Sequence, residues 1–301
     1  MREVATQLVQ ARGAGTSVHV RLIAVGRDAV EEVREGDGAT VALILLVSCI
    51  ALFFVASLWL AAARDGRTAG VPRGLRVVAS AGAFGALAYQ VRMSGLVTTA
   101  DDPVLSWLAD HRSAWLTGPA IAVTDAGGPV GTLVLAVVAG AVLSRRAHSL
   151  MPAIILIGTV GAAAAASTVT KSLVGRQRPP VVTQVLLETD HSFPSGHVTG
   201  AMALFGMTAV MLGFGLPATR RWALFLLAGG LTVLVAATRL YLGEHWLTDV
   251  VGGAVLGGTA VLAGSLVYAS WAAGLGRGQR DRGERDVPGS AVSPDRTVGV
   301  S

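Results

Sequence analysis

The chain has 301 residues, of which 52% are hydrophobic and only 14% are charged. Soluble domains carry about 25% charged residues, so this composition excludes an ordinary soluble protein and predicts an integral membrane protein. The formal net charge is +5. Such a charge can indicate nucleic-acid binding, but here the arginines stand in short loops between apolar stretches, which is typical of membrane topology signals. We therefore expect the bilayer as a partner and no nucleic acid.

Residues 1–39 are mixed polar and charged and are interpreted as an N-terminal tail. Residues 98–128 are polar and contain tryptophans, which predicts an outer connection. The charged segment 273–301 is predicted to be a disordered tail. A span needs about 20 apolar residues, which the first apolar stretch provides, whereas the second is weakened by Gln90 and Arg92. Seven candidate spans result, at 41–63, 77–97, 130–143, 151–169, 197–216, 222–237 and 250–271.

The arginines are concentrated in alternate connections. They follow the first, third, fifth and seventh spans and include Arg64, Arg67, Arg73, Arg76, Arg145, Arg146, Arg220, Arg221 and Arg277. Cytoplasmic loops carry an excess of arginine and lysine, so these connections are predicted to be cytoplasmic. The loop 172–196 and the stretch 238–249 then lie together on the extracytoplasmic side, where their polar residues can meet.

The first polar cluster begins at Lys171 and continues through Arg176 and Arg178. Lys171 is the only lysine among the 24 basic residues. Cations at the end of a span can simply extend to the interface. However, this is the side that should lack topological arginines, so three cations here favour a bound anion. Arg176 is not counted among the predicted site residues. Glu188, Asp190 and His191 in the same loop are predicted to be solvated.

Two further clusters lie at the same predicted surface. Ser195, Gly196 and His197 open the fifth span, where Ser195 either caps the helix or helps to bind an anion through the free N–H groups of the helix start. His245 and Asp249 are four residues apart and would share one face of a helix, so that the carboxylate orients the imidazole ring.

Together these residues resemble the three-part signature of the type-2 phosphatidic acid phosphatase superfamily, which includes vanadium haloperoxidases. The matching segments are Lys171-x6-Arg178-Pro179, Pro194-Ser195-Gly196-His197 and Arg239-x5-His245-x3-Asp249. The resemblance implies an all-α, polytopic transmembrane helical bundle over residues 75–272. The span within 40–64 would be an extra N-terminal helix added to a six-helix core. Thr238 departs from the serine that the family more often has, but keeps the hydroxyl.

The resemblance also implies residue roles, through a covalent phosphohistidine. His245 would attack phosphorus, Asp249 would orient it, and His197 would protonate the leaving oxygen. The phosphoryl group would be held by Lys171, Arg178, Ser195, Gly196 and Arg239. No metal and no other cofactor is expected, because fixed cations supply the positive charge.

The predicted activity is hydrolysis of a lipid phosphate or a polyprenyl diphosphate at the extracytoplasmic face of the cell membrane. Polyprenyl diphosphate is the leading candidate substrate, followed by phosphatidate and phosphatidylglycerophosphate. Two alternatives stay open: a non-catalytic lipid-binding or flippase-like membrane protein of the same fold, and a vanadate-dependent haloperoxidase. Seven spans argue against the haloperoxidase, since those enzymes are largely soluble. The sequence leaves the oligomeric state undetermined.

Overall fold

The computed structural model describes residues 38–62 and 69–285, and within these ranges the chain is helical with no strand. Most of the predicted tail 1–39, and residues 286–301 of the predicted tail 273–301, lie outside the described residues. The helices are α2 (Gly38–Ala62), α3 (Gly70–Arg92), η1 (Leu96–Ala100), α4 (Asp101–Asp110), α5 (Ala114–Ala126), α6 (Pro129–Ala147), α7 (Met151–Val174), η2 (Val181–Thr183), α8 (Gly196–Gly213), α9 (Ala218–Tyr241) and α10 (Leu247–Arg285). The polytopic helical bundle predicted from the sequence is confirmed.

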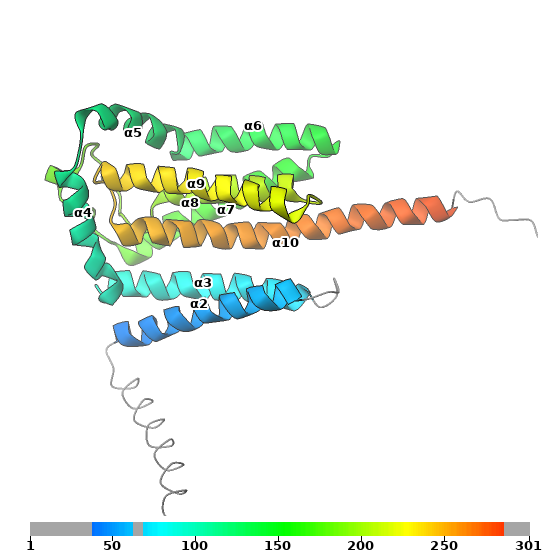
Figure 1. Cartoon of the computed structure of the whole chain (residues 1–301), viewed down its shortest axis with the longest axis horizontal. Coiled ribbons are helices and arrows are strands. Elements are labelled where there is room, and N and C mark those ends of the chain that lie inside the picture. Colours follow the sequence, from blue (N-terminus) through cyan, green and yellow to red (C-terminus); the bar gives the residue numbers. More distant parts are fainter. Residues whose placement is uncertain (1–37, 63–68, 286–301) are drawn as a thin grey trace, which may run out of the picture.

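Seven long helices run side by side in the bundle (Figure 1). Within the described residues, six of them are long and apolar enough to cross a membrane, rather than the seven expected. The exception is α3, a helix of 23 residues that carries Arg73, Arg76, Gln90 and Arg92. It packs between α2 and α10, so part of its surface contacts protein rather than lipid. A helix covered in this way can carry more polar residues than one surrounded by lipid.

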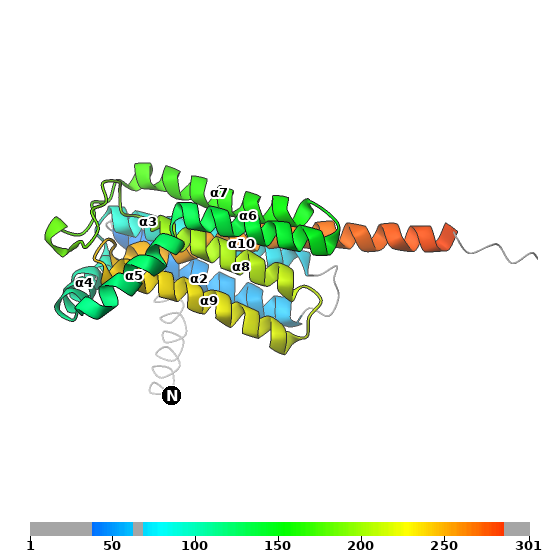
Figure 2. The same cartoon turned by 90° about the horizontal axis from the view of Figure 1, so that it is seen from above.

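The centre of the bundle is α8, which packs against α6, α7, α9 and α10 (Figure 2). Its buried residues Leu204 and Met207 join the main apolar core together with Leu156 of α7. Glycines bring α10 unusually close to it. A Cβ at Gly253 would lie 2.7 Å from the carbonyl oxygen of Ser195, so only glycine allows this approach of the two backbones. The first turns of α8 and α10 are thereby held against each other.

The polar segment 98–128 was predicted to be a simple connection, and the structure shows that it is mostly helical. It forms η1, α4 and α5, of which α5 packs on α9 and α4 lies across one end of the bundle (Figure 1). Trp107 and Trp115 on these helices are 60% and 74% exposed, as expected for interfacial aromatic residues. The two α-helices, α4 and α5, escaped prediction because they have only 10 and 13 residues, too few to give a span-length apolar pattern.

The two ends of the bundle differ in charge. Arg145 and Arg146 lie in the last turn of α6, and Arg220 and Arg221 in the first turns of α9, all at one end. The three signature clusters gather at the opposite end, where α7 and α9 finish and α8 and α10 begin (Figure 1). At the arginine-rich end, α10 continues to Arg285, beyond the end predicted at residue 271.

Candidate active site

All the predicted site residues come from helix ends or turns at one end of the bundle. Lys171 is in the last turn of α7, Arg239 in the last turn of α9 and Asp249 in the first turn of α10. The other predicted residues are Arg178, Ser195, Gly196, His197 and His245, which lie in the connecting loops or at the first residues of α8. Residues separated by up to 78 positions in the chain thus share one site.

A tight turn between α9 and α10 holds the loop after α7 in place. Gly243 has φ +72°, and a side chain there would collide with the carbonyl oxygen of Thr183 and with Arg112. Beside it, the N–H of Val185 donates to the carbonyl oxygen of Leu242 at 2.9 Å. Glycine is required at this position both for its backbone conformation and for the close approach of the loop.

His245 lies in that turn, just before α10, rather than within the helix that its spacing to Asp249 predicted. The pair nevertheless forms, with Nδ1 of His245 3.3 Å from Oδ2 of Asp249. The ring is buried, and its Nε2 lies 3.4 Å from Nη1 of Arg178. Burial, assisted by Arg178 and Arg239, lowers the pKa of His245 to about 4. The imidazole is therefore neutral at physiological pH, with Nδ1 directed at a carboxylate and Nε2 directed at cations.

Asp249 is held by a network that the sequence did not reveal. Its Oδ2 accepts from the N–H of Trp246 at 2.9 Å, and its Oδ1 accepts from Nη1 of Arg176 at 2.7 Å. Nη2 of Arg176 lies 2.5 Å from Oδ2 of Asp101. Asp101 in turn accepts from the backbone N–H of Thr248 at 2.9 Å. Because Asp101 lies 75 residues before Arg176, in a segment predicted to be a loop, no spacing rule connects them.

The three predicted anion-binding cations face two carboxylates of the loop after α7. Nζ of Lys171 lies 2.7 Å from Oδ2 of Asp190, and Nη2 of Arg239 lies 3.0 Å from Oε1 of Glu188. Arg178 contacts both carboxylates. Asp190 is 55% exposed and Glu188 33% exposed, in line with the predicted solvation, but both carboxylates also pair with these cations, which the sequence did not predict. Burial alone would raise the pKa of Asp190, but its bonds to Lys171 and Arg178 outweigh this and lower the pKa to about 2.

Glu244 is a further carboxylate of the site that the sequence did not reveal. It is fully buried and forms an ion pair with Arg239, whose Nη1 also donates to Thr124 Oγ1 at 2.9 Å. Burial raises the pKa of Glu244 to about 7, against the opposing effect of Arg239. Glu244 immediately precedes His245, and that adjacency was the only available signal.

Ser195 occupies the N-cap position of α8, but its side chain makes no capping hydrogen bond. Its hydroxyl is buried, and within the described residues it has no hydrogen-bond partner. The same holds for the hydroxyl of Ser167 on α7, the atom nearest to a Cβ placed on Gly196, at 4.0 Å. Ser167 and Gly196 line a space that a ligand can enter, and Ser195 directly precedes Gly196.

That space is a cavity of about 670 Å³ between α6, α7 and α8, within the range of ligand-binding pockets. Lys171, Arg178, His197 and His245 line its polar end. Much of the rest is lined by apolar residues of the three helices, including Leu133, Ala136, Ile157, Val160 and Ala164. Leu133 is 53% exposed, so the cavity opens on the outer face of the bundle. A charged end and an apolar side opening fit an amphiphile.

Comparisons with known proteins identify relatives of this chain. The family model described as the PAP2 superfamily matches residues 152–272, which include all eight predicted site residues. Phosphatidylglycerophosphatase B of Bacillus subtilis (strain 168) is 30% identical over 163 residues, covering 54% of this chain and 79% of the relative. Lipid phosphate phosphatase gamma of Arabidopsis thaliana is 33% identical over 107 residues, covering 34% and 43% of the two chains.

A solved structure is also similar. The crystal structure of the first transmembrane PAP2 type phosphatidylglycerolphosphate phosphatase from Bacillus subtilis superposes with a TM-score of 0.58 at 26% identity. The match covers 64% of this chain and 96% of that structure. Nearly the whole of the solved bundle therefore has a counterpart here, and this chain has additional residues outside the match.

Proposed function

The chain belongs to the PAP2 superfamily of membrane phosphatases, and we propose that it hydrolyses a lipid phosphate or diphosphate through a phosphohistidine formed on His245. One observation supports this most strongly. His245, Lys171 and Arg178 line the polar end of a cavity whose other walls are largely apolar. Asp249 pairs with His245, and Arg239 pairs with Glu188, which also lines the cavity. Such a site provides a nucleophile, an anion cradle and room for a lipid chain together.

In the proposed first step, Nε2 of His245 attacks phosphorus. Asp249 accepts a hydrogen bond from Nδ1–H, which leaves the lone pair on Nε2 facing the cradle and stabilises the ring as it becomes positively charged. Lys171, Arg178 and Arg239 neutralise the phosphoryl oxygens. Ser195 and the backbone of Gly196 complete the cradle, since the Ser195 hydroxyl has no partner among the described residues.

The loop carboxylates must leave the cations when the substrate enters. Glu188 and Asp190 occupy the positions of phosphoryl oxygens, and both belong to a loop with partly exposed side chains of 33% and 55%. Exchange of a carboxylate for a phosphoryl group conserves the charge balance of the cradle, because one set of anionic oxygens replaces another. Opening of this loop is therefore part of the proposed binding step.

His197 supplies the proton that the leaving oxygen needs. It lines the cavity next to His245, at the first turn of α8 and against the start of α6. In the second step a water molecule cleaves the phosphoenzyme, and His197 takes up the proton from that water. The apolar walls of the cavity hold the lipid chain, and the arginine-rich opposite end of the bundle supports an extracytoplasmic site.

Phosphate release from a panel of substrates tests this proposal. The purified protein is assayed with polyprenyl diphosphate, phosphatidylglycerophosphate, phosphatidate and a soluble phosphomonoester. We expect turnover of at least one lipid and much weaker turnover of the soluble ester, because the latter cannot use the apolar cavity. No release from any lipid would favour a non-catalytic protein of the same fold. Halide oxidation with vanadate and peroxide would favour the haloperoxidase.

A further inference from the structure

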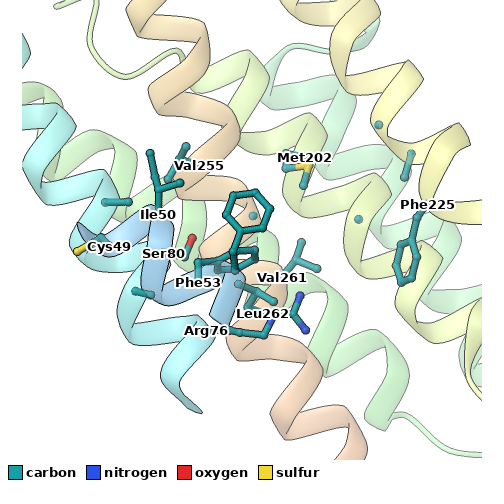
Figure 3. A pocket seen from close by; sticks show the side chains of 17 residues that line it. Cys49, Ile50, Phe53, Arg76, Ser80, Met202, Phe225, Val255, Val261 and Leu262 are labelled. Carbon is teal, nitrogen blue, oxygen red and sulfur yellow. The ribbon is translucent and has the colours of Figure 1, made fainter. Parts of the chain in front are cut away.

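A second hollow lies on another side of the bundle, and the active site does not include it. It is a groove of about 470 Å³ with α2 and α3 on one side, α9 on the other, and α8 and α10 as its floor (Figure 3). We call it the α2–α9 groove. Its walls include Ile50, Phe53, Phe54, Ala83, Met202, Phe225, Val255, Val261 and Leu262. It shares no lining residue with the cavity at the candidate active site.

The walls of the α2–α9 groove are almost entirely apolar. Ser80 lines it, but its hydroxyl is already bonded to Thr259 at 2.7 Å. Phe54 is 62% exposed, so the groove opens outward toward the lipid rather than toward water. Its size lies within the range of pockets that hold a small ligand. A hydrocarbon chain is the only abundant membrane component that matches these walls.

Arg76 gives the groove a charged end. It is the only lining residue with a permanent charge, and its guanidinium lies 5.1 Å from the centre of the Phe53 ring (Figure 3). Within the described ranges, its buried Nε has no hydrogen-bond partner. Arg76 is six residues into α3, about 9 Å from the helix start at the arginine-rich end, which is the depth of lipid head groups and upper acyl chains.

From this juxtaposition we infer that the α2–α9 groove binds an anionic membrane phospholipid. An acyl chain fills the groove between α2 and α9, and the phosphodiester accepts hydrogen bonds from Arg76. The bound lipid is a structural ligand in the leaflet opposite to the candidate active site, and it is not hydrolysed. The inference also gives a physical role to α2, the helix predicted to be an addition to the family core, because α2 supplies a wall of the groove.

The charge recognition is tested by native mass spectrometry of the purified full-length chain titrated with phosphatidylglycerol or phosphatidylcholine. The wild type is expected to bind the first phosphatidylglycerol about tenfold more tightly than phosphatidylcholine, because both lipids carry the phosphodiester but only phosphatidylcholine places a choline cation near Arg76. Arg76→Gln should remove this preference. Arg73→Gln is the matched control, because Arg73 is exposed one turn earlier on the same helix and does not line the groove. Equal preference in wild type and Arg76→Gln would overturn the inference.

The acyl-chain site is tested by filling the groove. A Cβ at Gly229 meets nothing within 4 Å and Gly229 lines the groove, so Gly229→Leu places a side chain where the lipid would lie. Gly230→Leu is the control, since Gly230 has equal free space but faces outward on the same helix. Loss of the first phosphatidylglycerol in Gly229→Leu alone supports the inference. Equal binding by the two variants contradicts it. Phosphate release should be unchanged in both, so failure of the proposed function would not affect this result.

Discussion

Arg176 offers a sharp test of how the site is built. It lies outside the family signature, yet its Nη1 is 2.7 Å from Oδ1 of Asp249 and its Nη2 is 2.5 Å from Oδ2 of Asp101. We predict that Arg176→Ala lowers both stability and turnover, although Arg176 contacts neither the nucleophile nor the three cradle cations in the described structure. The reason is that Asp249 orients His245, and Arg176 fixes Asp249.

The size of the effect follows from burial. The side chains of Asp101 and Asp249 are only 4% and 0% exposed, so Arg176→Ala leaves two carboxylates buried without their cation. Removing one partner of a buried ion pair costs about 3–5 kcal/mol, which corresponds to a fall in Tm of roughly 6–20 °C for a chain of this size. Misplacing a catalytic group by about 1 Å costs about 100-fold in rate, so a loss of at least this size in kcat is expected.

Thermal denaturation in detergent and phosphate release measure the two effects. Arg92→Ala is the matched control, since Arg92 is exposed near the same end and, among the residues that the structure describes, donates only to the carbonyl oxygen of Leu173. It should change stability by no more than about 0.5 kcal/mol. Arg176→Lys should have a Tm between those of Arg176→Ala and the wild type, because lysine keeps the charge but lacks the planar guanidinium that bonds both carboxylates. Wild-type kcat and Tm in Arg176→Ala would refute the positioning argument.

Three further predictions concern the cradle and the nucleophile. Lys171→Arg should reduce kcat despite the conserved charge, because a planar fork cannot reproduce a compact ammonium; wild-type kinetics would remove that argument. Asp190→Asn should lower KM about two- to fivefold, since a partly exposed carboxylate that competes for the cradle contributes about 0.5–1 kcal/mol; a raised KM would mean that Asp190 helps binding. The pKa of His245 is near 4, below its ordinary 6.5, so protonation of this ring should lower kcat/KM only as the pH falls through about 4. The same shift should make stability rise with pH between 4 and 6.5. A decline of kcat/KM centred at 6.5 would contradict the buried neutral ring.

Local patterns in the sequence were sufficient for the bundle and for the shared location of the signature residues. Apolar runs of span length predicted most long helices within a few residues, because membrane helices satisfy their own backbone groups and need little tertiary information. Alternating arginine clusters correctly grouped Lys171, His197 and His245 at one end. The weakest prediction was α3, where Arg73, Arg76, Gln90 and Arg92 obscure a long helix that neighbouring helices partly cover.

What the sequence could not provide were contacts between distant segments. Asp101 stabilises Arg176 across 75 residues, and the carboxylates of Glu188 and Asp190 contact the cations of the cradle. A loop rich in charges looks solvated when it is read alone. Only the relative placement of α7, α9 and α10 shows that its charges have partners.

The most direct test of the central claim is to trap the phosphoenzyme. The purified protein is mixed with a phosphate-labelled lipid substrate identified in the panel, quenched in alkali within the first turnover, and digested for peptide mapping. We predict an acid-labile, alkali-stable phosphate on the peptide that contains His245. It should be absent from His245→Ala and should form more slowly in His197→Ala, which cannot protonate the leaving oxygen. Full turnover in His245→Ala, or label on a different residue, would contradict the assignment of His245 as the nucleophile.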